Sequence, residues 1–395
     1  MNRTAQEQGS RSWRPQWRTD ERGLTLMETM MALAISVIVV GGAYEVLYNA
    51  MRMQTVNEQG VGTQQNVRIA MELIALDLKD AGFNSQVLTP PGLDLGGAAG
   101  NCGMNGVQPR DHTPTGNDTG PDSVSMIVPV SLSTLATAIT GAAPTTSVVL
   151  QNGAVAAAEG FGAAPYVNPV ISIAGYQVGT VSSISSDTLT LTAQVNLPKE
   201  STLPVGMQVY WLKCIMYKVV HASSNAATEQ PLCGGVLPCL VRGTPPCTVG
   251  QAGPACVAVV EGIEDLQLSY ACDGCVGTED NVIDDQVGGT ANQFDAADFM
   301  SNSSWNTGAF LPRTIRLAQV TVVGRQLGTA MGAESAGQGA RAIFSPSPLV
   351  VHDHNHADGV FAAGDLGAAG ALTTYQRQQR RVLTRIVQLK NMGLY

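Results

Sequence analysis

Three histidines near the end of the chain have the residue type and spacing of metal ligands. His352, His354 and His356 lie in the sequence HDHNHAD and are three of the five histidines in the protein. In an extended segment alternate residues point to the same side, so these imidazoles would together suit a first-row transition metal. The following sequence, GVFAAGDLGAAGA, is typical of a loop and adds no ligand by its spacing. We therefore favour a polar loop tip before the last strand, with a metal site as the alternative.

A second polar cluster, DGCVGTEDNVIDD, has the oxygen ligands that Ca²⁺ prefers. Its carboxylates are those of Asp273, Glu279, Asp280, Asp284 and Asp285. The spacing is not that of an EF-hand, because the glycine and the terminal glutamate are misplaced. We favour a solvated loop here.

Motifs for nucleophilic or metal-assisted catalysis are missing from the sequence. It contains no GxSxG, no HExxH and no Walker loop. We therefore expect no enzymatic activity and no cofactor, and a metalloenzyme centre at the histidines is the least favoured alternative.

The cysteines are even in number and all follow the apolar N-terminal segment. Five of the eight are crowded into residues 232–272, a Gly- and Pro-rich region without hydrophobic periodicity that would be loose without cross-links. We expect disulfides among Cys102, Cys214, Cys233, Cys239, Cys247, Cys256, Cys272 and Cys275. The alternative is a zinc site at the CxxC of Cys272 and Cys275, although no second CxxC accompanies it at ribbon spacing. The pairing cannot be deduced from sequence.

A single apolar segment, residues 23–44, interrupts an otherwise mixed sequence near the N-terminus. Its length approaches the roughly 20 residues that cross a bilayer as a helix. Glu28 is its one charge, and a carboxylate in a membrane segment requires a partner, a role or an interfacial position. The preceding leader carries five arginines against three acidic residues, which favours its retention in the cytoplasm.

The position of Gly23 suggests how this leader is removed. A secretory signal is cleaved after its apolar core, whereas here the small residue precedes the core. A residue without a side chain lets the backbone approach a protease closely, and cleavage there would leave the apolar helix on the mature protein. A plain membrane anchor with an incidental glutamate is the alternative.

Gly23, Leu24, Thr25, Leu26 and Glu28 resemble the class III signal of type IV prepilins and type II secretion pseudopilins. The resemblance implies that a prepilin peptidase cuts between Gly23 and Leu24 and methylates the new N-terminal amine of Leu24. It also implies that Glu28 is the assembly residue, with its carboxylate paired to an N-terminal amine in the membrane or fibre core. That family usually begins with Phe, from which Leu24 departs.

A helical pattern continues beyond the apolar segment, and we expect one helix over residues 24–81, ended by Gly82. Val67, Met71, Ile74 and Leu78 recur at helical spacing and predict a packed face. Gly41, Gly42, Gly60 and Gly62 are expected to weaken the helix locally.

Four blocks in order resemble the PilW family of minor pilins. They are NVRIAMELIALDLKDAGF at 66–83, VEGIEDLQLSYACD at 260–273, RTIRLAQVTVVGR at 313–325 and RRVLTRIVQLKNMG at 380–393. The first resembles the end of that family's helix, and the other three resemble its strands. The resemblance implies a structural subunit that helps to prime pilus assembly at the fibre tip, with other minor and major pilins as partners. A J-type minor pseudopilin of type II secretion and a fibre-displayed adhesive module are the alternatives.

The remaining sequence predicts a β-rich body. Half-buried strands with alternating apolar residues are expected at 123–130, with Pro129 indicating an edge, and at 187–195. A central strand is expected at 207–220. With 43 Gly and 20 Pro, the composition favours many turns, and the fold class is α+β: a long helix packed on a mainly antiparallel β body. The expected domains are a cytoplasmic leader (1–23), a transmembrane and assembly helix (24–83) and a periplasmic globular domain (84–395).

The charge balance limits the partners. The net charge is −9, and the compact basic cluster is the RQQRR sequence at 377–381, so nucleic acid is not an expected partner. We expect a single-pass protein of the inner membrane that later joins a pilus fibre at the cell surface.

Overall fold

A computed structural model defines the fold and describes most of the chain. The described residues are 25–83, 107–110, 120–162, 166, 169–222, 224–250, 256–274, 282–283, 294–301, 314–326, 349–352, 354–356, 375 and 378–390. The chain divides into two compact units, Met1–Gln54 and Thr55–Tyr395. Helix α1 contributes residues to both units, and the predicted domain limits stay predictions.

Helix α1 runs without interruption from Leu26 to Asp80. The hydroxyl of Thr25 accepts a hydrogen bond from the Glu28 amide at 3.3 Å, as at a helix N-cap. Gly82 follows the last turn with a φ of 75°, the left-handed conformation that ends many helices and that glycine adopts without strain. The helix is continuous through its four internal glycines.

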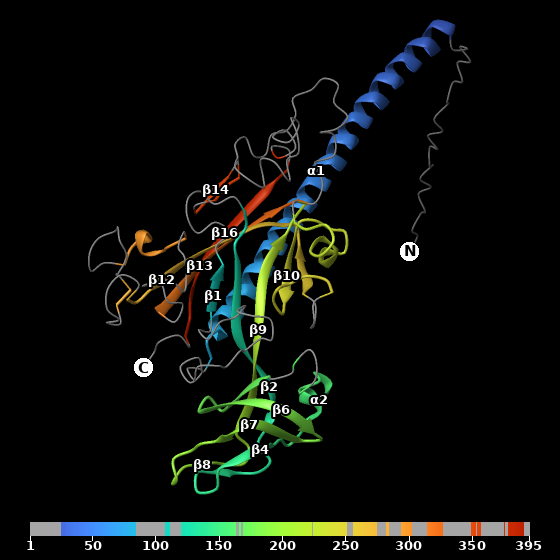
Figure 1. Ribbon diagram of the computed structural model, residues 1–395. Coiled ribbons are helices and arrows are strands. Elements are labelled where there is room, and N and C mark those ends of the chain that lie inside the picture. Colours follow the sequence, from blue (N-terminus) through green and yellow to red (C-terminus); the bar gives the residue numbers. More distant parts are fainter. Residues whose placement is uncertain are drawn as a thin grey trace, which may run out of the picture. The chain divides into compact units, whose positions relative to one another are not determined.

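In the second unit, the later turns of α1 pack against β-strands (Figure 1). The face predicted from periodicity is confirmed, because Val67, Met71, Ile74 and Leu78 are all buried in the largest hydrophobic core. The partners in this core come from strands far along the chain, including Leu266. The helix therefore stabilises the unit by tertiary packing.

An Ile74→Ala substitution is expected to lower the free energy of unfolding by about 2–5 kcal/mol, because it leaves a cavity in this core. Chemical denaturation of the full chain in detergent would measure the loss. Leu76→Ala is the matched control, since Leu76 lies on the same helix but is 60% exposed. Equal losses in the two variants would contradict the observed helix face.

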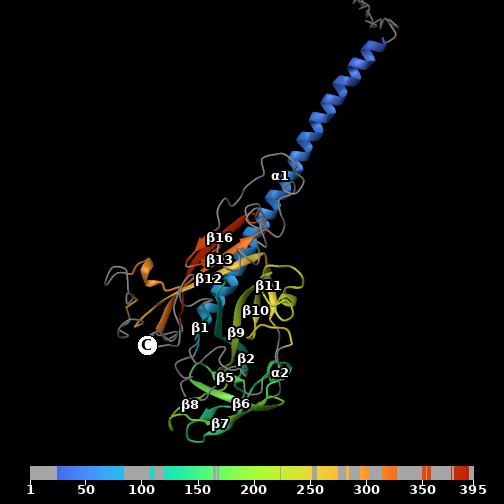
Figure 2. The same cartoon turned by 45° about the horizontal axis from the view of Figure 1, so that its top comes forward.

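A three-stranded antiparallel sheet covers one side of this core (Figure 2). Its order is β12 (Ile263–Cys272), β13 (Ile315–Arg325) and β16 (Arg380–Gln388). These are the strands expected within 260–273, 313–325 and 380–393. The register places Ile263 opposite Gly324 and Asp265 opposite Val323, so Glu264 is the extra residue of a β-bulge.

The second sheet contains nine strands and carries the middle of the chain. Its path is β1-β2-β9-β5-β6-β7-β4, and β10 pairs with both β9 and β11. The bounds are β1 Val107–Arg110, β2 Ser123–Thr134, β4 Thr145–Val149, β5 Val170–Ile173, β6 Gln177–Ser185, β7 Thr188–Val195, β9 Gln208–Val220, β10 Cys239–Gly243 and β11 Val257–Glu261. Small elements complete the described fold: α2 Ala154–Ala158, β3 Ile139–Thr140, β8 Thr202–Leu203, β14 Val350–Val351, β15 His354–Asn355, and 3-10 turns at Gln230–Cys233 and Ala296–Asp298.

The strand predictions in this sheet are largely confirmed. β9 is central, with partners on both sides, and β7 matches the expected alternating strand. The expected half-burial of β2 is wrong, because Val124 to Val128 are buried without alternation. Their side chains enter two different hydrophobic cores, one on each face of the strand. β1 pairs only with Ser123–Met126, so no described strand covers the outer edge at Pro129.

Disulfides cross-link the Gly- and Pro-rich region, as the cysteine count predicted. Cys233 is bonded to Cys239, and Cys247 to Cys256. Cys214 and Cys272 are also disulfide-bonded, which excludes Cys272 as a zinc-binding thiolate. Cys102 and Cys275 lie outside the described residues.

Candidate functional site

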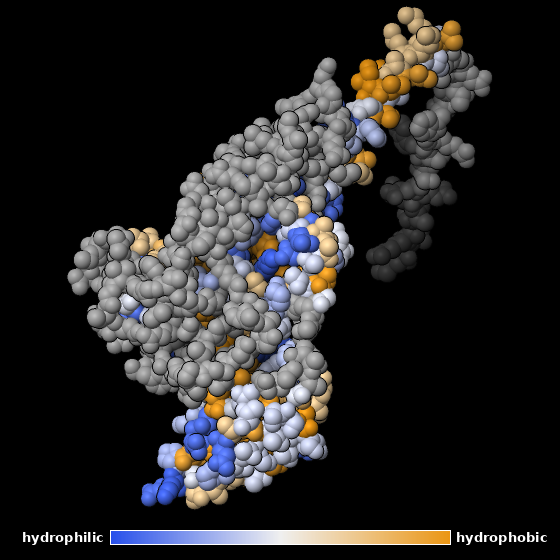
Figure 3. Space-filling view, viewed as in Figure 1, coloured by the Kyte–Doolittle hydropathy of each residue, from blue (hydrophilic) through white to orange (hydrophobic). Residues whose placement is uncertain are grey.

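The first candidate site is the start of α1. Glu28 lies exposed in its first turn, where the positive end of the helix dipole favours a carboxylate. Apolar side chains around the following turns are also exposed, as the orange segment in Figure 3 shows. They include Met30, Leu33, Ile35, Val37, Ile38, Val39 and Val40. Gly23 and Leu24, the predicted cleavage residues, lie outside the described part of the chain.

Such a continuous apolar surface requires a nonaqueous neighbour. Helix α1 is long and apolar enough to span a membrane, and no other described helix is. The arrangement therefore supports insertion of this segment in a bilayer or its packing against other apolar helices.

The second candidate site is formed by the histidine segment. Strands β14 and β15 make a small hairpin, closed by a hydrogen bond from the His356 amide to the Leu349 carbonyl at 2.9 Å. His354 and His356 are completely buried. The expected polar loop tip is therefore wrong for these two residues, because their imidazoles are covered by the body of the protein.

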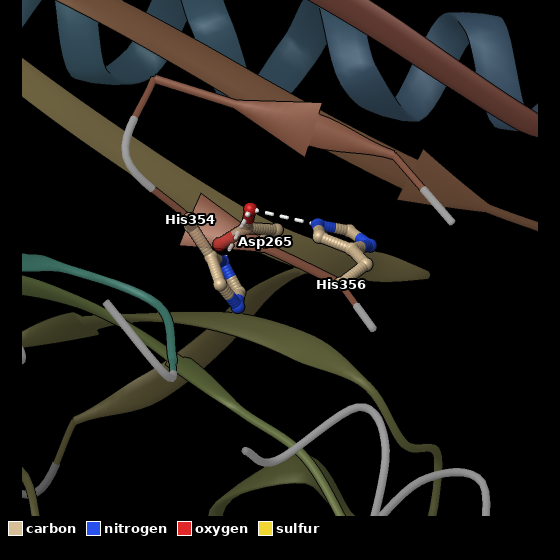
Figure 4. Close-up of side chains that lie close together, drawn as sticks. All are labelled: Asp265, His354 and His356. Atoms are coloured by element: carbon tan, nitrogen blue, oxygen red, sulfur yellow. Dashed lines mark hydrogen bonds and ion pairs between the residues drawn. The ribbon is translucent and has the colours of Figure 1, made fainter. Parts of the chain in front are cut away.

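Asp265 of β12 lies between the two imidazoles (Figure 4). Its Oδ2 atom is 3.1 Å from His354 Nδ1 and 3.0 Å from His356 Nε2, and the Asp265 side chain is also fully buried. One potential ligand atom from each of the three residues lies within 4.8 Å of the others. We call these three residues the Asp–His cluster.

Neighbouring polar groups hold the Asp–His cluster in place. The Gln267 amide nitrogen lies 3.1 Å from Asp265 Oδ1 and 3.1 Å from His354 Nδ1. On the other side, the Tyr375 hydroxyl is 3.1 Å from His356 Nδ1 and accepts a hydrogen bond from the Leu349 amide at 3.0 Å. Each ring of the cluster is thus oriented by a second contact.

The bulge in β12 explains how Asp265 reaches this position. Ile263 and Leu266 both enter the core against α1, although an odd spacing would place them on opposite faces of a regular strand. The extra residue, Glu264, shifts the alternation of side chains by one position, so that Ile263 and Leu266 point to the same face. Asp265, Gln267 and Leu266 are all buried, because the hairpin covers the face of the strand that α1 does not.

His352 does not join the other two histidines. Its φ of 52° breaks the alternation expected for an extended segment, and its Nε2 lies 2.9 Å from Thr321 Oγ1 of β13. The alternative in which three imidazoles share one side is therefore wrong. The structure replaces the third imidazole by a carboxylate from a distant strand.

Burial and hydrogen bonding have opposite effects on the pKa of Asp265. Burial alone would raise the pKa of this carboxyl, but the hydrogen bonds and charges of His354 and His356 together hold the pKa well below its usual range. At His352, burial lowers the pKa against a smaller opposing effect of the Asp265 charge. Asp265 is therefore an ionised acceptor in the interior.

Glu264 has a different set of partners. Its carboxylate receives two hydrogen bonds from Arg380, at 2.6 and 2.8 Å, and lies 3.7 Å from Arg325. The two arginines therefore compensate Glu264, whereas the ion-pair partners of Asp265 among the described residues are histidines.

The acidic segment supports no calcium site in its described part. Asp273 is buried and forms an ion pair with Arg316 at 3.1 Å. Glu279, Asp280, Asp284 and Asp285 lie outside the described residues.

Sequence reasoning missed Asp265 and Tyr375. A signal for Asp265 was present, because Asp265, Gln267 and Ser269 alternate with Leu266 and Leu268 along a buried strand. No comparable pattern marks Tyr375.

Comparison with known proteins bears on the N-terminal segment alone. Residues 18–44 match the family described as the prokaryotic N-terminal methylation motif. No curated protein and no solved structure matches this chain. The match covers the end of the leader, Gly23 and the apolar part of α1.

Proposed function

We propose that this chain is a minor pilin precursor of the PilW type, a structural subunit and not an enzyme. The observation that carries the proposal is the methylation motif at 18–44, followed directly by an uninterrupted helix with exposed apolar side chains. A prepilin-type motif is the signal of pilin-like and pseudopilin precursors, which a prepilin peptidase processes.

The rest of the fold supports a role as a subunit of an assembly. The later turns of α1 are buried in a disulfide-linked β body, so this part of the helix belongs to the same packed unit as the body. In our proposal the apolar turns pack against other pilins, and the β body is periplasmic before assembly and displayed at the fibre tip afterwards. A minor pseudopilin of type II secretion shares the motif and is the second candidate.

Gly23→Ala is expected to leave most of the chain unprocessed, because the added side chain obstructs the close backbone approach of the peptidase. Intact mass of the membrane-extracted protein would show retention of residues 1–23 in the variant and a methylated Leu24 start in the unaltered chain. Gly41→Ala is the control, since no atom lies within 4 Å of its added carbon. Normal cleavage of the Gly23 variant, or a mature start beyond the apolar segment, would contradict the proposal.

Deletion of the gene separates the two candidates. Loss of surface fibres with normal enzyme secretion supports the pilus role, and the reverse result supports the pseudopilin.

A further inference from the structure

We propose that the Asp–His cluster is a structural site for a divalent first-row metal ion, with Zn²⁺ as the preferred occupant. The ligands are Asp265 Oδ2, His354 Nδ1 and His356 Nε2. This site is separate from the N-terminal segment that carries the proposed function.

Two of the three distances between the ligand atoms fit a small coordination sphere. Bonds of about 2.0–2.1 Å in a tetrahedron place neighbouring ligand atoms roughly 3.3 Å apart. The two distances from Asp265 Oδ2 to the imidazole nitrogens are 3.0 and 3.1 Å. All three ligand atoms lie within 4.8 Å of one another, so a bound ion would have to draw the two imidazole nitrogens closer together.

The donor set selects the class of metal. Imidazole nitrogen suits zinc, copper, nickel and iron, whereas calcium and magnesium prefer oxygen ligands throughout. Two histidines and one carboxylate are a common zinc ligand set. No described cysteine is free, so thiolates do not compete for the ion within the described residues.

Burial strengthens the case for a cation. Asp265 is fully buried, and an ionised carboxylate in the interior is stable only when it is compensated. Arg325 and Arg380 are engaged by Glu264, which leaves two histidines, among the residues that the structure describes, to compensate Asp265. A bound divalent cation supplies that charge without requiring the imidazoles to be protonated.

The surrounding groups match those of bound metal ligands. A metal-ligating histidine usually donates its second ring N–H to an oxygen. His356 Nδ1 lies 3.1 Å from the Tyr375 hydroxyl, in position for this bond. The Gln267 side chain contacts both Asp265 and His354, and its amide oxygen is buried without a hydrogen-bond partner among the described residues. The Gln267 amide nitrogen lies 3.1 Å from His354 Nδ1, so the amide would have to rotate for the His354 nitrogen to bind an ion, and the rotation would offer the oxygen as a fourth ligand.

The consequence for the fold is a cross-link between distant segments. The ion would join β12 to the hairpin of β14 and β15, about 90 positions later in the sequence. It would fix the hairpin over the face of the three-stranded sheet that α1 does not cover.

Metal analysis of the full chain tests the proposal. The protein is purified in detergent without a histidine tag, stripped with a chelator, equilibrated with Zn²⁺ and separated from free metal. We expect about one zinc ion per chain, a higher melting temperature with Zn²⁺, and the visible absorption of tetrahedral Co²⁺ after substitution. A folded chain that retains no zinc and gives no such absorption overturns the proposal.

Four variants locate the ion. Asp265→Asn and His356→Gln should each lose zinc and the zinc-dependent rise in melting temperature. His352→Gln is the matched control and should bind as the unaltered chain does, because His352 contacts Thr321 and not the cluster. Tyr375→Phe should bind zinc roughly 10–100-fold more weakly. Tyr375→Phe keeps all three ligands, so it tests the site even if the ligand variants fail to fold.

The alternative is a metal-free network in which both neutral imidazoles donate N–H bonds to Asp265. It predicts no zinc binding by the unaltered protein. Zinc binding that is unchanged in His356→Gln or Tyr375→Phe would place the ion elsewhere and also overturn the proposal. Because processing at Gly23 does not enter these measurements, either proposal can fail without the other.

Discussion

A Glu28→Ala variant is expected to be inserted and cleaved normally but to enter fibres at least about tenfold less often than the unaltered chain. Glu28 is exposed within an apolar surface at the start of α1. When neighbouring helices bury that surface, its carboxylate is expected to pair with the N-terminal amine of its own or a neighbouring subunit. Loss of the carboxylate leaves that cationic amine uncompensated.

The size of the effect follows from the cost of such a charge. A charged group in the centre of a membrane helix costs about 2.5–3.5 kcal/mol, which corresponds to roughly two orders of magnitude in an equilibrium constant. Membrane insertion of the variant is not expected to decrease, because the substitution removes a charge from the apolar segment. Assembly and insertion are therefore affected differently.

Quantitative immunoblots of sheared fibres and of membranes would measure the two populations. Glu45→Ala is the matched control, because Glu45 is exposed on the same helix and its replacement changes the net charge equally. Glu28→Asp should recover part of the assembly. Normal fibre incorporation of Glu28→Ala would show that the carboxylate has no role in assembly.

Arg380→Met is expected to lower the free energy of unfolding by about 3–5 kcal/mol. Arg380 forms two hydrogen bonds with the buried carboxylate of Glu264, and its guanidinium lies 3.3 Å from the centre of the Tyr375 ring. Methionine keeps the apolar stem but removes the charge. Glu264 would then keep only the longer contact to Arg325, at 3.7 Å.

Two further variants separate this buried pair from ordinary surface charges. Arg385 lies on the same strand and pairs with Glu72, whose side chain is 73% exposed, so Arg385→Met should cost less than about 1 kcal/mol. The double variant Glu264→Gln/Arg380→Met should be more stable than Arg380→Met, since it removes the uncompensated carboxylate. Equal losses in Arg380→Met and Arg385→Met, measured by chemical denaturation, would refute the assignment.

Local patterns in the sequence were sufficient for the main elements. The spacing of Val67, Met71, Ile74 and Leu78 defined the packed face of α1, and Gly82 marked its end. The three C-terminal strands were expected at their observed places because the blocks at 260–273, 313–325 and 380–393 resemble strands of a known family. Burial of β2 on both faces was not foreseen, because that depends on which elements cover the strand.

The N-terminal segment was also readable from sequence, since its chemistry resides in consecutive residues. The leader charges, Gly23 and the apolar run belong to one linear motif, and the comparison at 18–44 rests on the same residues. The motif can therefore be identified without knowledge of the folded structure.

The Asp–His cluster, by contrast, was decided by tertiary structure. The sequence showed that three histidines alternate, but the positive φ of His352 removes one of them from the group. The bulge at Glu264 and the antiparallel register bring Asp265 to the other two across about 90 residues. Local spacing fixes which residues share a face of one element, whereas the contact between two distant elements depends on how the whole core packs.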